Sequence, residues 1–186
     1  MNYLFDFYGT LVTDSIAEYM RTMTESFGLK VEDYQKTVQG LVNKRDFPSR
    51  DDALDHLLKS LRVTFSKEAR GQFFSRMDRW KESLRSQPHV YEVLEELRFG
   101  GSGVAIVTNI NRFIEDVVQD LYFDISVDHV VMSHKVGCAK PDERIYRIAL
   151  EKLGVGPEDV TMVGDNYKND VEAPMKLGMK GILFDP

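Results

Sequence analysis

The spacing of hydrophobic and polar positions changes twice along the chain. A short aromatic and apolar run at residues 3–5 leads into Asp6, and Gly9 permits a sharp exit from it, which predicts a buried central strand followed by a polar turn. From residue 13 to about 88 the apolar positions recur at helical spacing. From residue 89 onward, short continuous apolar runs alternate with helical stretches. This pattern predicts a sheet whose first strand is separated from the others by a helical block.

The helical block is expected to form a bundle that buries its apolar stripes internally. Ser49 followed by Asp52 resembles a capping box, and Ser66 is placed to cap the last helix. The block begins soon after Asp6, so it is well placed to act as a lid over a site there. The expected helices are residues 16–27, 34–42, 53–61 and 73–84.

The second half of the chain predicts parallel strands joined by helices, which is typical of a doubly wound α/β sheet. The expected architecture is a Rossmann-like core of residues 1–12 and 89–186 with a helical cap of residues 13–88. Pro174 lies inside the last predicted helix and leaves the start of that helix open. The further strands are expected at 104–107, 130–132, 160–163 and 182–184, and the helices at 90–97, 114–121, 145–153 and 171–177.

Composition narrows the class of protein. With 186 residues, 42% of them hydrophobic, the chain can bury the core of one domain with an insertion. A net charge of -6 argues against a general nucleic-acid binder. No apolar run is long enough to span a bilayer, and the N-terminus has no signal-like basic lead. Cys138 is the single cysteine, which excludes an internal disulfide and fits a cytoplasmic protein.

Charge is distributed unevenly between the two expected parts. The helical block has a net charge of about +2, so the remainder carries about -8. A slightly basic lid over an acidic sheet is compatible with a small anionic substrate. Solvated helix faces are the simpler explanation of the same charges.

Polar residues follow the predicted strands at the edge where open α/β sheets bind ligands. Asp6 is a candidate nucleophile and metal ligand, and Asp165 could hold a magnesium ion with it. Lys140 could neutralise an approaching anion. Thr108 and Asn109 end another strand, and the helix predicted after them would offer free N–H groups to the same anion. Thr108, Asn109 and Lys140 are therefore the expected substrate-binding residues.

Four stretches in this order resemble the motifs of the haloacid dehalogenase superfamily of hydrolases, over essentially the whole chain. They are FDFYGTLV, IVTN, KPDERIY and MVGDNYKND. The resemblance implies a Rossmann-like fold with a helical cap inserted after the first strand. It also implies that Asp6 forms a covalent intermediate that water hydrolyses, that Thr108 hydrogen-bonds the transferring group and that Lys140 balances charge. Asp165 would ligate magnesium, with Asp170 ligating or orienting the ion from behind.

Tyr8 departs from the commonest pattern of this superfamily. The phosphatase branch has at this position a second aspartate, which protonates the leaving group and activates water. Tyr8 can still give a backbone carbonyl to the metal, but a phenol with a pKa of about 10 is a poor general base at pH 7. The dehalogenase branch has an aromatic residue here, so Tyr8 resembles that branch.

The acidic pair of the last motif points the other way. Dehalogenases of the superfamily work without metal, whereas Asp165 and Asp170 match the magnesium-dependent branch, and without a metal these carboxylates would repel Asp6. The first hypothesis is therefore a magnesium-dependent phosphatase that acts on a small phosphate ester or anhydride. The alternatives are a metal-independent 2-haloacid dehalogenase and a catalytically weak binding or regulatory protein. The four histidines show no ligand spacing and are expected to be surface or satisfied residues.

Overall fold

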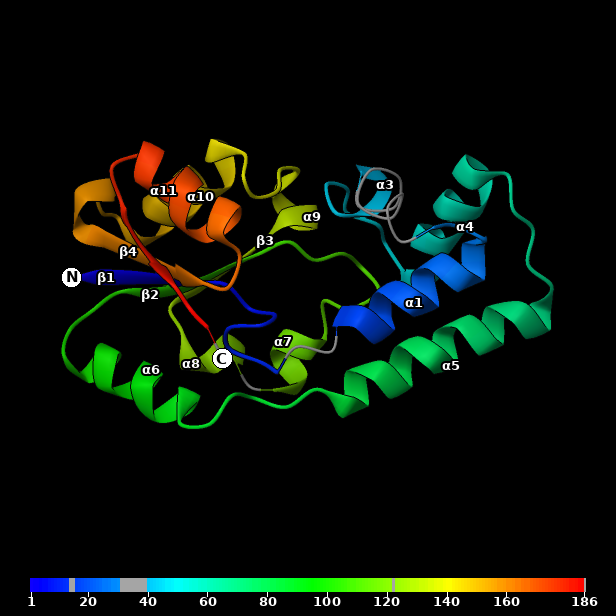
Figure 1. The fold of residues 1–186 in the computed structure, drawn as a ribbon, viewed down its shortest axis with the longest axis horizontal. Helices are drawn as coiled ribbons and strands as arrows, with labels where there is room; N and C mark the ends of the chain where they lie inside the picture. Colours follow the sequence, from blue (N-terminus) through cyan, green and yellow to red (C-terminus); the bar gives the residue numbers. More distant parts are fainter. Residues whose placement is uncertain (14–15, 31–39, 122, 186) are drawn as a thin grey trace.

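A five-stranded parallel sheet organises the computed structural model, which describes residues 1–13, 16–30, 40–121 and 123–185 (Figure 1). The strand order is β3-β2-β1-β4-β5, so the first strand lies at the centre, as the sequence predicts. All four strand pairs are parallel. The strands are β1 (Asn2–Phe5), β2 (Val104–Thr108), β3 (His129–Met132), β4 (Val160–Gly164) and β5 (Lys180–Leu183).

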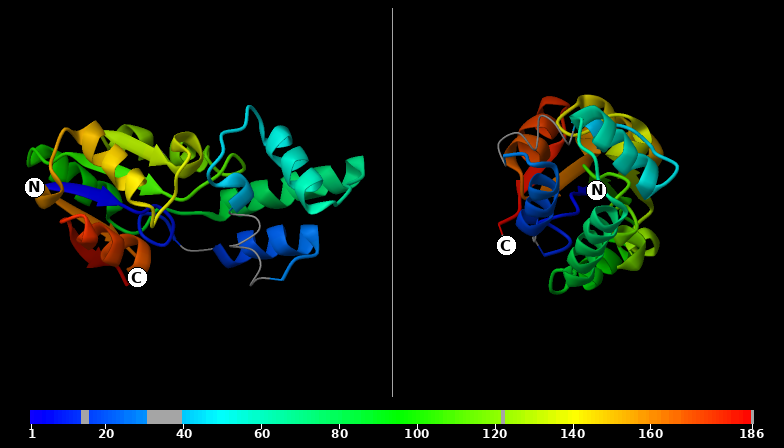
Figure 2. Two further views of the ribbon diagram at one scale, coloured as in Figure 1. Left: turned by 90° about the horizontal axis from the view of Figure 1, so that it is seen from above. Right: turned by 90° about the vertical axis from the view of Figure 1, so that its right-hand side faces the viewer.

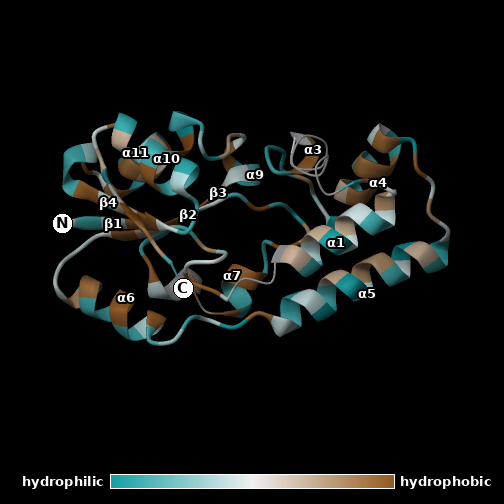
Figure 3. Cartoon of the chain, viewed as in Figure 1, coloured by the Kyte–Doolittle hydropathy of each residue, from teal (hydrophilic) through white to brown (hydrophobic). Residues whose placement is uncertain are grey.

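Alternate residues of the central strands enter two separate apolar cores, because side chains of a strand point to opposite faces. Leu4 joins a core with residues of α10 (Glu143–Leu153), whereas Phe5 joins a core with residues of α6 (Val90–Phe99). The two helices cover opposite faces of the sheet, and the strands between them are largely hydrophobic (Figures 1 and 3). Burial on both faces explains why these strands read as continuous apolar runs.

Three predicted elements near the site need correction. The helix predicted at 114–121 is confined to α7 (Val117–Asp120), because the Asn111 side chain accepts a hydrogen bond from the Phe113 amide and holds a turn before it. The helix predicted at 171–177 is divided into a π-helical segment η3 (Tyr167–Glu172) and α11 (Ala173–Lys176), with Pro174 in the first turn of α11. The last strand starts at residue 180 and ends at 183, rather than spanning 182–184.

Short helical segments make up most of the remaining connections. They are α8 (Phe123–Ser126), α9 (Ser133–Val136) and the 3₁₀ turn η2 (Pro157–Asp159). In the described part of the chain, no helix has both the length and the apolar character needed to cross a membrane.

The inserted helices form a lobe beyond the carboxyl ends of the strands (Figures 1 and 2). Ser49 and Ser66 cap two of them through bonds from the Asp52 and Ala69 amides, which confirms both predicted caps. Of the helix predicted at 34–42, only a short C-terminal part lies within the described residues. The helices of the lobe are α1 (Ile16–Phe27), α3 (Gly40–Val42), α4 (Arg50–Leu61) and α5 (Lys67–Ser83).

The cap packs directly onto the core, since one apolar cluster contains residues of both. The Phe73 ring of α5 contacts Phe113 of the core with ring centroids 5.5 Å apart. Val12 forms isolated bridges with Tyr8 and Ser86, so the outgoing and returning chains meet at the base of the cap. The domain boundaries at residues 12/13 and 88/89 stay predictions, and this meeting point is consistent with them.

Candidate active site

The register of the sheet places the predicted site residues at one edge. Phe5 pairs with Ile106 on one side and with Val163 on the other. The next residue, Asp6, is therefore level with the end of β2, where Thr108 lies, and with the end of β4, which Asp165 follows. Pairing of parallel strands is what brings these distant stretches together, as the sequence predicts.

Asp6 is held by hydrogen bonds on its backbone and its side chain. Its amide donates to the Val163 carbonyl at 2.9 Å, which continues the β1–β4 ladder by one residue. Its Oδ1 accepts from the Phe7 amide at 2.7 Å and lies 2.8 Å from Lys140 Nζ. The side chain remains 14% exposed. A carboxylate that is oriented by its own loop and still reaches solvent is suited to act as a nucleophile.

Lys140 joins Asp6 to a second carboxylate. Its Nζ lies 2.7 Å from Asp170 Oδ1, and the side chains of Lys140 and Asp170 are 1% and 0% exposed. Burial alone would lower the pKa of Lys140, but the charges of Asp6 and Asp170 outweigh it and raise that pKa. Burial raises the pKa of Asp170 to about 6, against the lowering effect of Lys140. The ammonium therefore stays charged and compensates two carboxylates at once.

Two glycines make room for the acidic residues. Gly9 has a φ of +78°, and a Cβ on it would collide with the Asp165 carboxylate. A Cβ on Gly164 would collide with the Asp170 carboxylate. The Gly-Thr and Gly-Asp pairs of the sequence therefore reflect close approach of carboxylates to the backbone, in addition to turn formation.

Asp6, Asp165 and Asp170 can each offer a carboxylate oxygen within 4.8 Å of the others. Lys140 supplies one positive charge to both Asp6 and Asp170, which leaves a surplus of one negative charge on these two carboxylates, and Asp165 brings a third carboxylate to the group. Clustered oxygen donors with this surplus fit a divalent, oxygen-preferring cation such as Mg²⁺. The side chains present therefore match the predicted magnesium site.

Tyr8 points toward the cap. Its hydroxyl is buried and has no hydrogen-bond partner among the described residues. Its ring lies 5.0 Å from the Phe7 ring and 5.7 Å from the Trp80 ring, measured between centroids. Burial raises the pKa of the phenol well above 10, so the group stays protonated. The catalytic and metal-ligating roles of Tyr8 stay predictions, and a metal contact through its backbone carbonyl would leave this packing intact.

The end of β2 differs from the prediction in one way and shows one contact that was not predicted. No helix follows Asn109 directly, because α7 begins only at Val117, so the expectation of an anion site at a helix N-terminus is wrong. The side-chain amide of Asn109 binds the backbone of Lys140, with distances of 2.9 and 2.8 Å, and its substrate contact stays a prediction. Spacing along the sequence carries no signal for the contact with Lys140. Thr108 is 1% exposed at the end of β2, and its substrate contact stays a prediction.

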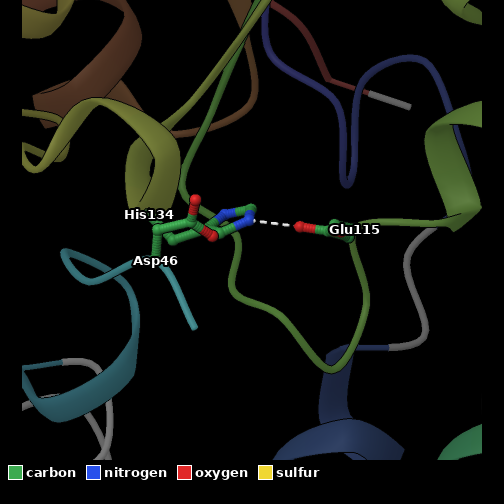
Figure 4. Close-up of side chains that lie close together, drawn as sticks. All are labelled: Asp46, Glu115 and His134. Atoms are coloured by element: carbon green, nitrogen blue, oxygen red, sulfur yellow. Dashed lines mark hydrogen bonds and ion pairs between the residues drawn. The ribbon is translucent and has the colours of Figure 1, made fainter. Parts of the chain in front are cut away.

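A second group of possible ligands lies between the cap and the core and consists of Asp46, Glu115 and His134 (Figure 4). The His134 ring nitrogens lie 2.5 Å from Glu115 Oε2 and 3.2 Å from the Ile110 carbonyl oxygen, which confirms the expectation of a satisfied histidine. Lys135 pairs with both carboxylates at 2.9 and 3.3 Å.

Arg112 also forms an ion pair with Glu115. Two cationic side chains therefore match the two carboxylates of this second group, and no surplus charge calls for a metal ion. The balance differs from that around Asp6, where one lysine is shared by two carboxylates and a third carboxylate lies within reach of both.

Comparison with known proteins agrees with this geometry. The family model of haloacid dehalogenase-like hydrolases matches residues 2–178. Haloacid dehalogenase-like hydrolase domain-containing protein 3 of Mus musculus is 36% identical over 105 residues, which is 53% of this chain and 42% of that protein. Phosphoserine phosphatase of Thermus thermophilus is 33% identical over 102 residues, or 53% and 40% of the two chains. This chain thus covers about two-fifths of the length of these curated relatives.

The structural likeness extends further than the sequence likeness. A HAD family enzyme of Bacteroides thetaiotaomicron, solved in complex with magnesium and inorganic phosphate, has a TM-score of 0.75 at 17% identity. The alignment covers 99% of this chain and 93% of that enzyme. The likeness shows that the sheet and the inserted helices form one known fold.

Proposed function

The chain belongs to the haloacid dehalogenase-like hydrolases, and from this premise we propose that it is a magnesium-dependent phosphatase acting on a small phosphorylated metabolite. The observation that carries the proposal is the group of three carboxylates at Asp6, two of which share the single positive charge of Lys140 and so keep a surplus of negative charge. An anionic phosphoryl group would be repelled by such a site unless a divalent cation were present. The same surplus disfavours a metal-independent dehalogenase.

The proposed reaction has two steps, both at Asp6. A carboxylate oxygen of Asp6 attacks phosphorus, and the bond from phosphorus to the leaving oxygen breaks, which gives an aspartyl-phosphate. Water then attacks phosphorus, the bond to the Asp6 oxygen breaks, and orthophosphate is released. Thr108 would donate a hydrogen bond to the transferring group, and Lys140, 2.8 Å from Asp6 Oδ1, keeps the carboxylate oriented. Asp6, Asp165 and Asp170 would hold the magnesium ion, whose charge offsets that of the phosphoryl group.

Tyr8 suggests which phosphorylated compounds would react fastest. Its phenol stays protonated and is buried against the cap, so the described site has no acid at position 8 to protonate a leaving alkoxide. Leaving groups of low pKa need little proton assistance. We therefore expect acyl phosphates, anhydrides and aryl esters to be better substrates than alkyl phosphates.

The names of two relatives agree with a phosphatase. Phosphoserine phosphatase and glyceraldehyde 3-phosphate phosphatase, the latter from Pyrococcus furiosus, are named for small phosphorylated metabolites. A solved neighbour described as a dehalogenase is 25% identical, with a TM-score of 0.64, so the fold alone does not separate the two activities. The choice of phosphatase rests on the carboxylates.

The test is phosphate release from acetyl phosphate, p-nitrophenyl phosphate and an alkyl phosphate, with Mg²⁺ or with a chelator. We expect turnover that requires Mg²⁺ and is abolished in Asp6→Asn, which keeps the shape of the side chain. Equal turnover of Asp6→Asn would overturn the proposal. Halide release from 2-chloropropionate in the presence of chelator would support the dehalogenase, and thermal stabilisation by ligands without turnover would support a binding protein.

A further inference from the structure

The amide side chain of Asn109 forms a reciprocal pair of hydrogen bonds with the backbone of Lys140. Its Nδ2 donates to the Lys140 carbonyl at 2.9 Å, and its Oδ1 accepts from the Lys140 amide at 2.8 Å. Among the described residues, both main-chain groups of Lys140 are therefore bound by the same side chain. The two residues are 31 positions apart in sequence and belong to different loops at the carboxyl edge of the sheet.

The position of the Lys140 backbone determines where its ammonium lies. Nζ must reach Asp6 Oδ1 at 2.8 Å and Asp170 Oδ1 at 2.7 Å at the same time. Lys140 follows a loop and is itself followed by Pro141, so no helix or strand of its own fixes its main chain. Asn109, which directly follows β2, is anchored by the sheet.

We propose that Asn109 is a positioning residue that transmits the rigidity of the sheet to Lys140 and thereby places the ammonium against the nucleophile. The proposal rests on the phosphatase activity proposed above and changes the role of Asn109 from a substrate contact to a support of Lys140. Loss of the amide releases the loop that carries Lys140, and misplacement of a charged group by about 1 Å can cost about 100-fold in rate. The effect of Asn109 therefore acts through Lys140.

A double-mutant cycle separates this role from general structural support. We expect Asn109→Ala to lower kcat about tenfold or more while KM changes less than about threefold. In a Lys140→Ala background, the same substitution should lower kcat less than about twofold, because no ammonium remains to be positioned. Equal factors in both backgrounds would overturn the proposal.

Asn2 provides a matched control at the opposite edge of the sheet. Its side chain likewise accepts from one backbone amide, that of Gly103 at 2.9 Å, and donates to one backbone carbonyl, that of Asp159 at 3.4 Å. Asn2→Ala should change kcat by less than about twofold in both backgrounds. If Asn109→Ala does not fold, Asn109→Asp, which keeps the shape and the acceptor but loses the donor, replaces it in the cycle.

Lysine acetylation measured by peptide mass spectrometry gives a readout that does not need turnover. Lys140 is 1% exposed and ion-paired in the folded protein, so it should react slowly with acetic anhydride. We expect its acetylation to become about tenfold faster in Asn109→Ala but not in Asn2→Ala, with exposed Lys168 as the internal reference. Unchanged protection of Lys140 would refute the positioning role, whereas absent turnover of the wild type with faster acetylation would refute only the phosphatase.

Discussion

At the scale of single residues, the site is centred on Lys140, whose ammonium lies 2.8 Å from Asp6 Oδ1 and 2.7 Å from Asp170 Oδ1. The sequence could predict that Asp6, Lys140 and Asp170 meet. Asp6 and Asp170 follow the carboxyl ends of parallel strands, and Lys140 lies in a loop at the same edge of the sheet. The contact of Asn109 with Lys140 and the burial of the Tyr8 hydroxyl could not be predicted, since both depend on loop paths and on cap packing.

The hydroxyl of Tyr8 gives a prediction at this scale. Because it is buried without a described partner, its removal in Tyr8→Phe loses no hydrogen bond. We expect the free energy of unfolding to stay the same or rise by about 1 kcal/mol, with turnover retained. Urea unfolding and steady-state kinetics measure both.

Tyr8→Asp is the contrasting variant. It would remove a ring that packs on Phe7 and Trp80. It would also place a carboxylate where burial, and after it the charges of Tyr19, Asp116 and Asp6, raise the pKa of the Tyr8 phenol. We expect a loss of about 3 kcal/mol or more in unfolding free energy. Urea unfolding of Tyr8→Asp measures this loss. For Tyr8→Phe, a more than tenfold loss of turnover would contradict the expectation above and would show that the hydroxyl takes part in the reaction.

At the scale of elements, hydrophobic periodicity is sufficient to predict those helices that form by packing an apolar stripe against a core. Helices α4, α5, α6 and α10 lie where their apolar stripes predict them. The periodicity failed where side chains bind the local backbone instead. Asn111 holds a turn before α7, and Asn166 accepts from the Asn169 amide at the start of η3. Such asparagine turns compete with the helix that the apolar positions predict.

Asp142, the residue that caps the N-terminus of α10, gives a prediction at this scale. Asp142 accepts from the Arg144 amide at 3.1 Å and pairs with the Arg144 side chain at 2.6 Å. The substitution Asp142→Ala removes the side chain that caps this helix and should lower the free energy of unfolding by about 1 kcal/mol at pH 7. The Asp142→Asn control keeps an oxygen for the amide and loses only a surface ion pair, so its cost should be smaller.

The stability that Asp142 contributes should depend on pH. The Arg144 side chain, and then its amide, lower the pKa of Asp142 to about 2 in the folded state, against about 3.9 in an unfolded chain. The stabilisation is therefore present above about pH 4 and is lost as the pH falls toward 2. The difference in unfolding free energy between wild type and Asp142→Asn should shrink over this range. A difference that is constant from pH 7 to 2.5 would contradict the prediction.

At the scale of the whole molecule, polar contacts join the cap to the core beside the site. Asn111 of the core donates to the Tyr19 hydroxyl and to Asn43 Oδ1, both at 2.9 Å and both in the cap. Lys81 of α5 pairs with Asp116 at 2.5 Å. The insertion of a cap could be predicted from the sequence, whereas its seating on the core through buried asparagines could not.

Asn111→Ala should loosen this seating. The side chain is 1% exposed, so its removal takes two hydrogen bonds away from buried groups and should cost about 2 kcal/mol. We expect hydrogen exchange to become faster in α1 and around Asn43, with the central strands protected as before. The control is Arg70→Ala, which breaks exposed ion pairs with Asp51 and Asp55 inside the cap and should cost less than about 1 kcal/mol. Equal exchange in the two variants would contradict the role of Asn111.

Magnesium binding should distinguish the two groups of possible metal ligands in this molecule. In the group of Asp6, Asp165 and Asp170, one lysine is shared by two of the carboxylates, whereas Asp46 and Glu115 are already paired with Lys135 and Arg112. We therefore expect a single Mg²⁺ to bind, and a concentration of 100 times its Kd to stabilise the fold by about 2.7 kcal/mol. Calorimetric titration and thermal unfolding measure the stoichiometry and the stabilisation.

Two matched variants then assign the ion to one cluster. Asp170→Asn should abolish the stabilisation by Mg²⁺, because it removes one charge from the site with the surplus. Asp46→Asn should leave both stoichiometry and affinity unchanged, since Asp46 lies in the cluster whose charges are matched within the protein. Binding of a second ion that disappears in Asp46→Asn would show that local charge balance does not decide where this protein binds a cation.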